Sequence, residues 1–287
     1  MDDISVITPV YKGNKYLPTL LHVIEKAADR IKPHKVNWIL VNDSPTIKLV
    51  SLNTKLKNLK ITKIENSHNL GIQKSRIVGL NHATSKYIMF LDQDDKIESS
   101  ALKIHLLNIK NSDVSITNGY EINSSEHTKE KFFNKFAEMN VLKKLPYYFY
   151  LGNFIISPGM TLIRRSAIPD VWKETNLKIN GADDWLLWVL MLCKGSIFSL
   201  NFEPTYSHMR NDENVSNNVE NMIDSTYEAL NVFCKEYPQK KRLYKIGKRR
   251  LEFWKDLQVN GSNKYKLYLL NPDIAFYAIK KKMLRIF

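Results

Sequence analysis

Three carboxylates, Asp92, Asp94 and Asp95, stand within four positions directly after a run of apolar and aromatic side chains. The run, Tyr87-Ile-Met-Phe-Leu91, has the length and composition of a buried strand. Closely spaced carboxylates repel one another and lose hydration when packed, so the cluster indicates either a hard divalent cation or an exposed acidic turn. If the strand belongs to an open α/β sheet, the cluster lies at its carboxyl end, where such sheets bind ligands.

Two further polar stretches could bind a nucleotide beside this cluster. Asp43 follows a strand-like run and could accept hydrogen bonds from a base or ribose. Lys74 and Arg76 could face phosphate oxygens, for which arginine has a planar fork, although an arginine on a helix face is often only solvated. Asp92 and Asp94 could then hold Mg²⁺ or Mn²⁺ bridging a diphosphate, because hard cations bind carboxylate and phosphate oxygens together.

A second acidic pair opens the strongly apolar stretch Asp183-Asp-Trp-Leu-Leu-Trp-Val-Leu-Met-Leu192, which we expect to be a helix. Acidic residues in the first turn of a helix are stabilised by its backbone amides and dipole, so capping is one interpretation of the pair. The other is that the pair supplies a general base. One carboxylate could serve both purposes.

The elements that must position these residues alternate along the first half of the chain. Strands are expected at 4–11, 36–41, 59–64, 87–91, 114–117 and 161–164, and helices at 20–28, 73–82, 99–107, 183–192 and from about 222 onward. Strands alternating with helices at short intervals predict an α/β fold built on a single doubly wound, mainly parallel sheet flanked by helices. Residues 124–144 are polar and charged with scattered aromatics, so we expect an excursion or mobile loop there.

The composition limits the class of protein. With 287 residues, 44% of them hydrophobic, the chain can hold one large domain with an appendage. We expect a catalytic domain over residues 1–220 and a helical basic extension over 221–287. No run approaches the roughly 18 apolar residues of a transmembrane helix, and the chain opens without a signal-like segment, so a cytoplasmic location is expected.

The formal net charge is +14, and the densest basic runs lie at 239–250 and 280–287. A solvated helical face is one interpretation. Attachment to an anionic membrane surface, at the inner face of the membrane, is another, because apolar and aromatic residues interleave with the lysines of the tail. Nucleic acid is not expected as a partner, since no recognised binding motif accompanies the charge.

Five motifs together resemble those of a family 2 glycosyltransferase of the GT-A fold, of the kind that builds bacterial surface polysaccharides such as capsule. The resemblance covers about residues 3–216 and depends on motifs in the family's order and spacing: Ser5-Val-Ile-Thr-Pro-Val-Tyr11, Ile39-Leu-Val-Asn-Asp-Ser44, Asn69-Leu-Gly-Ile-Gln-Lys-Ser-Arg76 with Gly79, Phe90-Leu-Asp-Gln-Asp-Asp95 and Asp183-Asp-Trp-Leu-Leu-Trp188. Each motif alone is weak, but five in order are specific.

The resemblance implies roles for individual positions. Pro9 and Tyr11 would line the nucleotide pocket, Asp43 would face the uracil and ribose, and Arg76 would lie near the base or phosphates. Asp92 would approach the ribose or the metal ion, and Asp95 would begin or brace the next loop.

Asp94 would be the direct ligand of Mn²⁺ or Mg²⁺. A late histidine often lies near the metal in the family, and here two alignments compete, one placing His208 there and the other Asn211. Asp184 would be the catalytic base. Asp183 would start the helix or bind the acceptor, and Trp185, like Trp188, would be an acceptor-site or a core aromatic.

The implied reaction is an inverting, metal-dependent transfer of a hexosyl or N-acetylhexosaminyl group. The donor would be a nucleotide sugar, most simply a UDP sugar, and the acceptor a hydroxyl of a growing lipid-linked surface glycan. Two alternatives remain: a degenerate nucleotide-sugar-binding protein without transfer activity, and a phosphatase that uses an Asp-x-Asp pair.

Overall fold

The computed structural model describes residues 3–123, 126–210 and 217–283, and the chain divides into two compact units. The sheet unit comprises Met1–Lys131, Ser157–Ile168 and Ser196–Arg210. The helical unit comprises Phe132–Ile156, Pro169–Gly195 and Asn211–Phe287. Each unit therefore combines segments that are distant in sequence.

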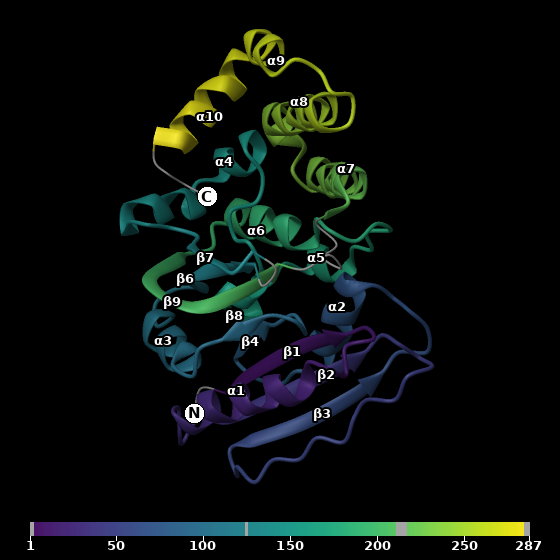
Figure 1. Cartoon of the computed structure of the whole chain (residues 1–287), viewed down its shortest axis with the longest axis vertical. Helices are drawn as coiled ribbons and strands as arrows, with labels where there is room; N and C mark the ends of the chain where they lie inside the picture. The colour runs from purple at the N-terminus through teal and green to yellow at the C-terminus, as the bar shows by residue number, and fades with distance from the viewer. Residues whose placement is uncertain (1–2, 124–125, 211–216, 284–287) are drawn as a thin grey trace. The chain divides into compact units, whose positions relative to one another are not determined.

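The sheet unit is built on one sheet, which has nine strands in the described part of the chain, in the order β3-β2-β1-β4-β8-β6-β9-β5 with β7 paired to β6 (Figure 1). The strands are β1 (Ile4–Val10), β2 (Val36–Asn42), β3 (Leu59–Glu65), β4 (Tyr87–Phe90), β5 (Lys96–Ile97), β6 (Val114–Asn123), β7 (Thr128–Lys131), β8 (Thr161–Arg164) and β9 (Phe198–Arg210). Parallel pairings join β3, β2, β1 and β4, and also β6 with β9. The shorter β5, β7 and β8 pair antiparallel.

The central strands are buried on both faces, which explains their continuous apolar runs. All four residues of β4 are buried, and β1 and β2 are buried at nearly every position. Because β1 lies between β2 and β4 in parallel register, the residues that follow these three strands emerge at one edge of the sheet. That edge carries Tyr11, Asp43 and the acidic turn that begins at Asp92.

Among the described residues, the α-helices of the sheet unit are α1 (Leu17–Asp29), α2 (Ile72–His82) and α3 (Ala101–Asn108). Helix α1 buries an apolar stripe that includes Leu20 and Ile24. Helix α2 packs close to the sheet at Gly79, where an added Cβ would lie 2.4 Å from Cγ2 of Ile7 and 3.2 Å from Cγ2 of Val41. The glycine thus allows α2 to lie directly on β1 and β2.

Replacing this glycine should cost stability. Gly79→Ala drives a methyl group into the fully buried Ile7, so we expect a loss of about 1 to 3 kcal/mol in the free energy of unfolding, measured by urea denaturation. Asn81→Ala, at an exposed position of the same helix, should change it by less than about 0.5 kcal/mol. Equal stability of the two variants would show that α2 does not depend on this close approach.

The helical unit contains the remaining α-helices of the described residues. They are α4 (Leu145–Tyr150), α5 (Asp170–Glu174), α6 (Asp183–Cys193), α7 (Val219–Glu236), α8 (Lys241–Gln258), α9 (Lys264–Leu270) and α10 (Pro272–Met283). Helix α6 is buried around most of its circumference, with Trp185, Leu186 and Trp188 each no more than 3% exposed. Helices α7 and α8 are amphipathic, and bury residues such as Phe233 and Leu251.

The prediction of a mobile loop over 124–144 is wrong for residues 126–144. Strand β7 and the 3-10 helix Phe136–Lys143 occupy much of this stretch. The scattered aromatic and apolar residues, including Phe132, Phe133 and Met139, are buried at 1% exposure or less. Their burial supplies the apolar contacts that order a segment of otherwise polar composition.

No helix among residues 3–123, 126–210 and 217–283 combines the length and apolar character needed to cross a membrane.

Candidate functional site

The turn after β4 is built around the Asp95 carboxylate, which is only 2% exposed. Its Oδ2 accepts hydrogen bonds from the Tyr206 hydroxyl and from Ser157 Oγ (3.3 Å). Its Oδ1 accepts from the backbone amide of Met209 (3.2 Å) and lies 3.1 Å from Nδ1 of His208. One buried carboxylate therefore ties the acidic turn to β9, as expected of a residue that braces the loop.

The same carboxylate orients His208. Burial by itself lowers the pKa of His208, but the hydrogen bond and charge of Asp95, together with the charges of Asp92 and Asp94, raise it above the ordinary value. The sheet unit thus brings His208 close to all three acidic residues of the turn. The competing position, Asn211, lies outside the described residues.

The Asp95 network should be a major source of local stability. Asp95→Ala removes the carboxylate that accepts from the buried Tyr206 hydroxyl and from the half-buried Met209 amide, so we expect a loss of about 3 kcal/mol in the free energy of unfolding. Tyr206→Phe, which removes one hydrogen bond, should cost about 1 kcal/mol. Urea denaturation measures both values. A loss from Asp95→Ala no larger than that from Tyr206→Phe would contradict the network.

Arg76 and Asp92, both predicted as nucleotide-site residues, form an ion pair. Nη2 of Arg76 lies 2.6 Å from Oδ1 of Asp92, and the arginine side chain is 3% exposed whereas the aspartate is 23% exposed. The pair joins α2 to the acidic turn. Asp94, two positions after Asp92 in the same turn, is half-buried.

Asp43 is 4% exposed, and its carboxylate organises the loop before α2. Oδ1 accepts hydrogen bonds from Nδ2 of Asn66 (2.8 Å) and the amide of Leu70 (2.7 Å), and Oδ2 accepts from the amide of Gly71 (2.9 Å). Gly71 has a φ of 84°, in the region that favours glycine. Asp43 therefore holds the Asn69–Arg76 segment against the end of β2, and its contact with a nucleotide stays a prediction.

Gln93 joins the acidic turn to the end of β1. Its Oε1 accepts from the amide of Tyr11 (3.0 Å), and its Nε2 donates to the carbonyl of Tyr11 (3.1 Å). An added Cβ at Gly13 would lie 1.8 Å from Oε1 of Gln93, so the glycine makes room for this side chain. Tyr11 itself is 45% exposed, and Pro9 at the end of β1 is half-buried.

In the helical unit, the second acidic pair occupies the first turn of α6. Asp184 is half-buried; its Oδ2 accepts from Nδ2 of Asn153 (2.8 Å) and its Oδ1 from the amide of Trp185 (2.6 Å). The amide contact is consistent with the capping interpretation. Burial, and after it the charge of Asp184, raise the pKa of the Tyr148 hydroxyl well above its ordinary value.

Asp183 and Trp185 are buried at 3% exposure each. The indole Nε1 of Trp185 donates to the carbonyl of Tyr148 (3.1 Å), and its ring packs edge-on against Phe149 at 5.5 Å. Of the two interpretations of this tryptophan, these contacts support a core aromatic. The backbone carbonyl of Asp183 accepts from Nε1 of Trp172 (2.7 Å), which anchors the start of α6.

Among the described residues, no three acidic, histidine or cysteine side chains are arranged as a complete metal cage. The acidic turn nevertheless fits a cation that takes most of its ligands from a diphosphate and water, because magnesium commonly uses only one or two protein carboxylates. His208 supports this fit. A carboxylate held at Nδ1, as Asp95 is, is the usual arrangement behind a histidine that binds metal through Nε2.

Several residues of these clusters were not identified from the sequence. Tyr206 and Ser157 contact Asp95 across 111 and 62 positions of sequence, and Asn153 contacts Asp184 across 31. Local patterns carry no signal for such pairs. Gln93 could have been identified, since it stands inside the acidic turn and its side-chain amide can bind both the N–H and the carbonyl of a peptide.

The structure also places Lys74, a predicted nucleotide-site residue. Lys74 is half-buried on α2, two positions before Arg76.

Comparison with known proteins shows which family of proteins the chain resembles. The sequence profile described as Glycosyl transferase family 2 matches residues 5–172, more than half of the chain. An uncharacterized glycosyltransferase of Rickettsia felis is 25% identical over 203 residues, which cover 70% of this chain and 32% of the relative. The Escherichia coli enzyme UDP-Glc:alpha-D-GlcNAc-diphosphoundecaprenol beta-1,3-glucosyltransferase WfgD is 26% identical over 213 residues, covering 70% of this chain and 75% of the relative.

Among solved structures, Staphylococcus aureus TarS 1-349 in complex with UDP-GlcNAc aligns with a TM-score of 0.58 at 18% identity, covering 89% of this chain and 73% of that chain. At this identity the likeness establishes the fold. The chain spans about a third of the length of the two Rickettsia relatives that it matches.

Proposed function

We propose that this chain, which belongs to glycosyl transferase family 2, transfers a sugar from a nucleotide donor to a hydroxyl group of a growing surface glycan. The observation that carries the proposal is the turn after β4, where Asp94 stands between the Arg76–Asp92 ion pair and the Asp95–His208 pair. Asp94 is a half-buried carboxylate of this turn, and the aspartates on either side of it in sequence are held by these two pairs.

The donor is proposed to be a UDP sugar bound at the carboxyl edge of β1, β2 and β4. Pro9, Tyr11 and Asp43 face the nucleoside, while Lys74 and Arg76 balance the charge of the diphosphate. The named relatives support this class of donor, because WfgD uses UDP-Glc by its name and TarS was solved with UDP-GlcNAc. The same comparison supports a hexosyl or N-acetylhexosaminyl donor.

Asp94, with Asp92 and His208 beside it, is proposed to hold Mn²⁺ or Mg²⁺. When bound, the cation would stabilise the negative charge that develops on the departing diphosphate. The protein's own part is to hold Asp94 in a turn fixed by the buried Asp95 and by the hydrogen bonds of Gln93 to Tyr11.

Asp184 is proposed as the general base. As the acceptor hydroxyl oxygen bonds to the anomeric carbon, its proton passes to the Asp184 carboxylate, and the bond from the anomeric carbon to the phosphate oxygen breaks with its electron pair leaving on UDP. A single displacement inverts the anomeric configuration. The hydrogen bond from Asn153 orients the carboxylate for this step, and Asp183 is proposed to fix the start of α6 or to contact the acceptor.

The acceptor is proposed to be a lipid-linked saccharide of a bacterial cell envelope. WfgD acts on a diphosphoundecaprenol-linked sugar by its name, which supports this class of acceptor.

The catalytic part is proposed to lie within residues 1–220, with residues 221–287 as a basic helical extension at the inner face of the membrane.

Incubating the purified chain with a panel of nucleotide sugars and Mn²⁺, and measuring nucleotide release, tests the proposal. We expect UDP release from at least one UDP sugar, and loss of release with a chelator. Binding of UDP without turnover of any donor would favour a degenerate nucleotide-sugar-binding protein. Release of phosphate from a simple phosphate ester, without turnover of any sugar donor, would favour the phosphatase alternative.

A further inference from the structure

Six large apolar side chains are exposed on two consecutive helices of the helical unit, and we call them the α9–α10 surface: Tyr265, Leu269, Leu270, Phe276, Ile279 and Met283. Leu269 is 83% exposed and Met283 78%. Elsewhere in the described part of the chain, exposed large apolar residues stand singly in sequence. A concentration of this kind marks a site of interaction with a protein or a membrane.

On α10 the exposed residues form a regular stripe. Phe276, Ile279 and Met283 recur at intervals of three and four positions, which places them on one side of the helix. Lys280 and Lys282, both exposed, lie on either side of the stripe. This arrangement of an apolar stripe bordered by lysines is typical of helices that lie in a membrane interface.

The opposite side of α10 is packed against its own unit. Ile274 belongs to a small core cluster with Phe253 of α8 and Leu267 of α9. The ring of Tyr277 stacks on Tyr150 of α4, with ring centroids 3.9 Å apart. The apolar stripe therefore faces away from a side that is already filled.

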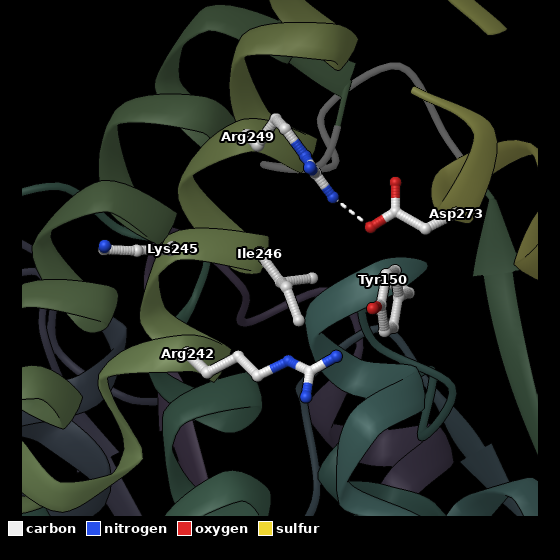
Figure 2. Close-up of a pocket in the computed structure, with 6 residues that line it drawn as sticks. All are labelled: Tyr150, Arg242, Lys245, Ile246, Arg249 and Asp273. Atoms are coloured by element: carbon white, nitrogen blue, oxygen red, sulfur yellow. Dashed lines mark hydrogen bonds and ion pairs between the residues drawn. The ribbon is translucent and has the colours of Figure 1, made fainter. Parts of the chain in front are cut away.

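An ion pair strengthens this attachment. Figure 2 shows Arg249 of α8 reaching Asp273 at the start of α10, above the ring of Tyr150. Together with the aromatic stack, the ion pair holds α10 in one orientation. The surface is thus presented by a fixed helix.

The charge of this region is strongly positive. Residues 264–283 contain five lysines and one acidic residue, Asp273, which is paired with Arg249. Two more cations, Arg242 and Lys245, join Arg249 around a pocket of about 320 Å³ lined also by Tyr150, Ile246 and Asp273 (Figure 2). Lysines near a membrane surface are attracted to anionic lipid headgroups.

The positive charge of this region argues against a second copy of the chain as the partner that binds the α9–α10 surface. A two-fold contact through the stripe would bring Lys280 and Lys282 of one copy toward the same lysines of the other, because such an interface repeats the same patch on both sides. Like charges facing one another oppose association. An anionic lipid surface complements both the stripe and the lysines.

We propose that the α9–α10 surface docks on an anionic phospholipid bilayer, with Phe276, Ile279 and Met283 entering the interface and the surrounding lysines contacting lipid headgroups. The purpose of this contact rests on the proposed function, since it would bring the transferase to a lipid-linked acceptor. The contact itself depends only on the helical unit, and its test does not require turnover.

Sedimentation with vesicles tests the proposal. The full chain is mixed at low salt with vesicles of phosphatidylcholine containing about a third phosphatidylglycerol, and the bound fraction is measured against lipid concentration. We expect Ile279→Ser combined with Phe276→Ser and Met283→Ser to weaken binding at least about tenfold, because each residue loses apolar burial in the interface. These residues are exposed, so folding should persist.

A matched control is available in the sheet unit. Ile197 is 59% exposed, as is Ile279, and Ile197→Ser should bind vesicles like the unmodified chain. Replacing Lys280 and Lys282 by glutamine should weaken binding to anionic vesicles about tenfold or more, and binding should be far weaker for all forms on pure phosphatidylcholine.

Three outcomes would overturn the proposal: no recruitment of the unmodified chain to vesicles, equal vesicle binding by the triple variant, or a concentration-dependent dimer of the unmodified chain that the triple variant abolishes.

UDP release measured without lipid separates the docking proposal from the proposed function. If the triple variant retains release but loses vesicle binding, docking is supported and catalysis is unaffected. If release is absent from every form while vesicle binding follows the expected pattern, only the proposed function fails.

Discussion

Asp94→Asn is expected to lower the turnover of the UDP sugar on the order of a thousandfold, which is the scale of losing one main electrostatic contact to a developing charge. The change preserves the shape of the side chain and removes the charge that a divalent cation requires. Asp94 is half-buried, in a turn whose fixed point is the neighbouring Asp95, so the fold should remain. Steady-state UDP release at saturating Mn²⁺ measures the effect.

Glu98→Gln is the matched control for this variant, because Glu98 is an exposed carboxylate a few positions further along the same segment. It should retain the turnover of the unmodified chain. Titration of UDP by calorimetry adds a second readout, since Asp94→Asn should abolish the increase in affinity that Mn²⁺ produces. Manganese-dependent turnover at the unmodified rate in Asp94→Asn would place the cation elsewhere.

Asp184→Asn is expected to reduce transfer to the acceptor by about 10² to 10⁴, the range that a positioned general base contributes. Asparagine can keep the hydrogen bonding of the first turn of α6 through its amide oxygen but cannot take a proton from the acceptor hydroxyl. Binding of UDP with Mn²⁺ should be unchanged. Transfer rate and calorimetric titration of UDP, measured on the same preparation, give the two values.

The control for the second variant is Asp224→Asn, an exposed carboxylate of α7 in the same unit. Its transfer rate should equal that of the unmodified chain. If Asp184→Asn transfers normally, the base lies elsewhere. If the variant loses stability in urea denaturation along with activity, Asp184 serves to stabilise the first turn of α6 through its contact with the amide of Trp185.

The family and the fold could be predicted from the sequence because both depend on local patterns. The five motifs predicted family 2, and the match over residues 5–172 confirms it. Continuous apolar runs marked the buried strands, so β4 was placed within one residue of its observed end. The GT-A fold and the helical extension are confirmed by the structure and by its likeness to TarS.

The composition of the helical unit could not be predicted in the same way. It combines residues 132–156 and 169–195 with the helices after residue 217, and the contacts that join them are long-range. Phe149, for example, packs on Trp185 and on Phe233, at centroid distances of 5.5 and 4.8 Å. A polar stretch with a few aromatics resembles a loop until such partners are known.

The candidate site residues could be identified from the sequence by their residue types, but the side chains that bind them in the structure could not. The acidic turn was evident from its carboxylates, whereas the burial of Asp95 depends on Tyr206 and His208 from β9. Arg76 was expected near the base or phosphates of a nucleotide, and the structure pairs it with Asp92. Charge and spacing identify which residues can do chemistry, and packing decides which of them are already engaged.

The central claim is that Asp94 holds a cation beneath the diphosphate of a bound nucleotide at the carboxyl edge of β4. The most direct measurement is the anomalous diffraction signal of manganese in crystals of the chain grown with UDP and Mn²⁺. We expect a manganese peak within bonding distance of a carboxylate oxygen of Asp94 and of the diphosphate, with the uridine beside Pro9 and Tyr11. Manganese and UDP bound away from Asp94 would contradict it.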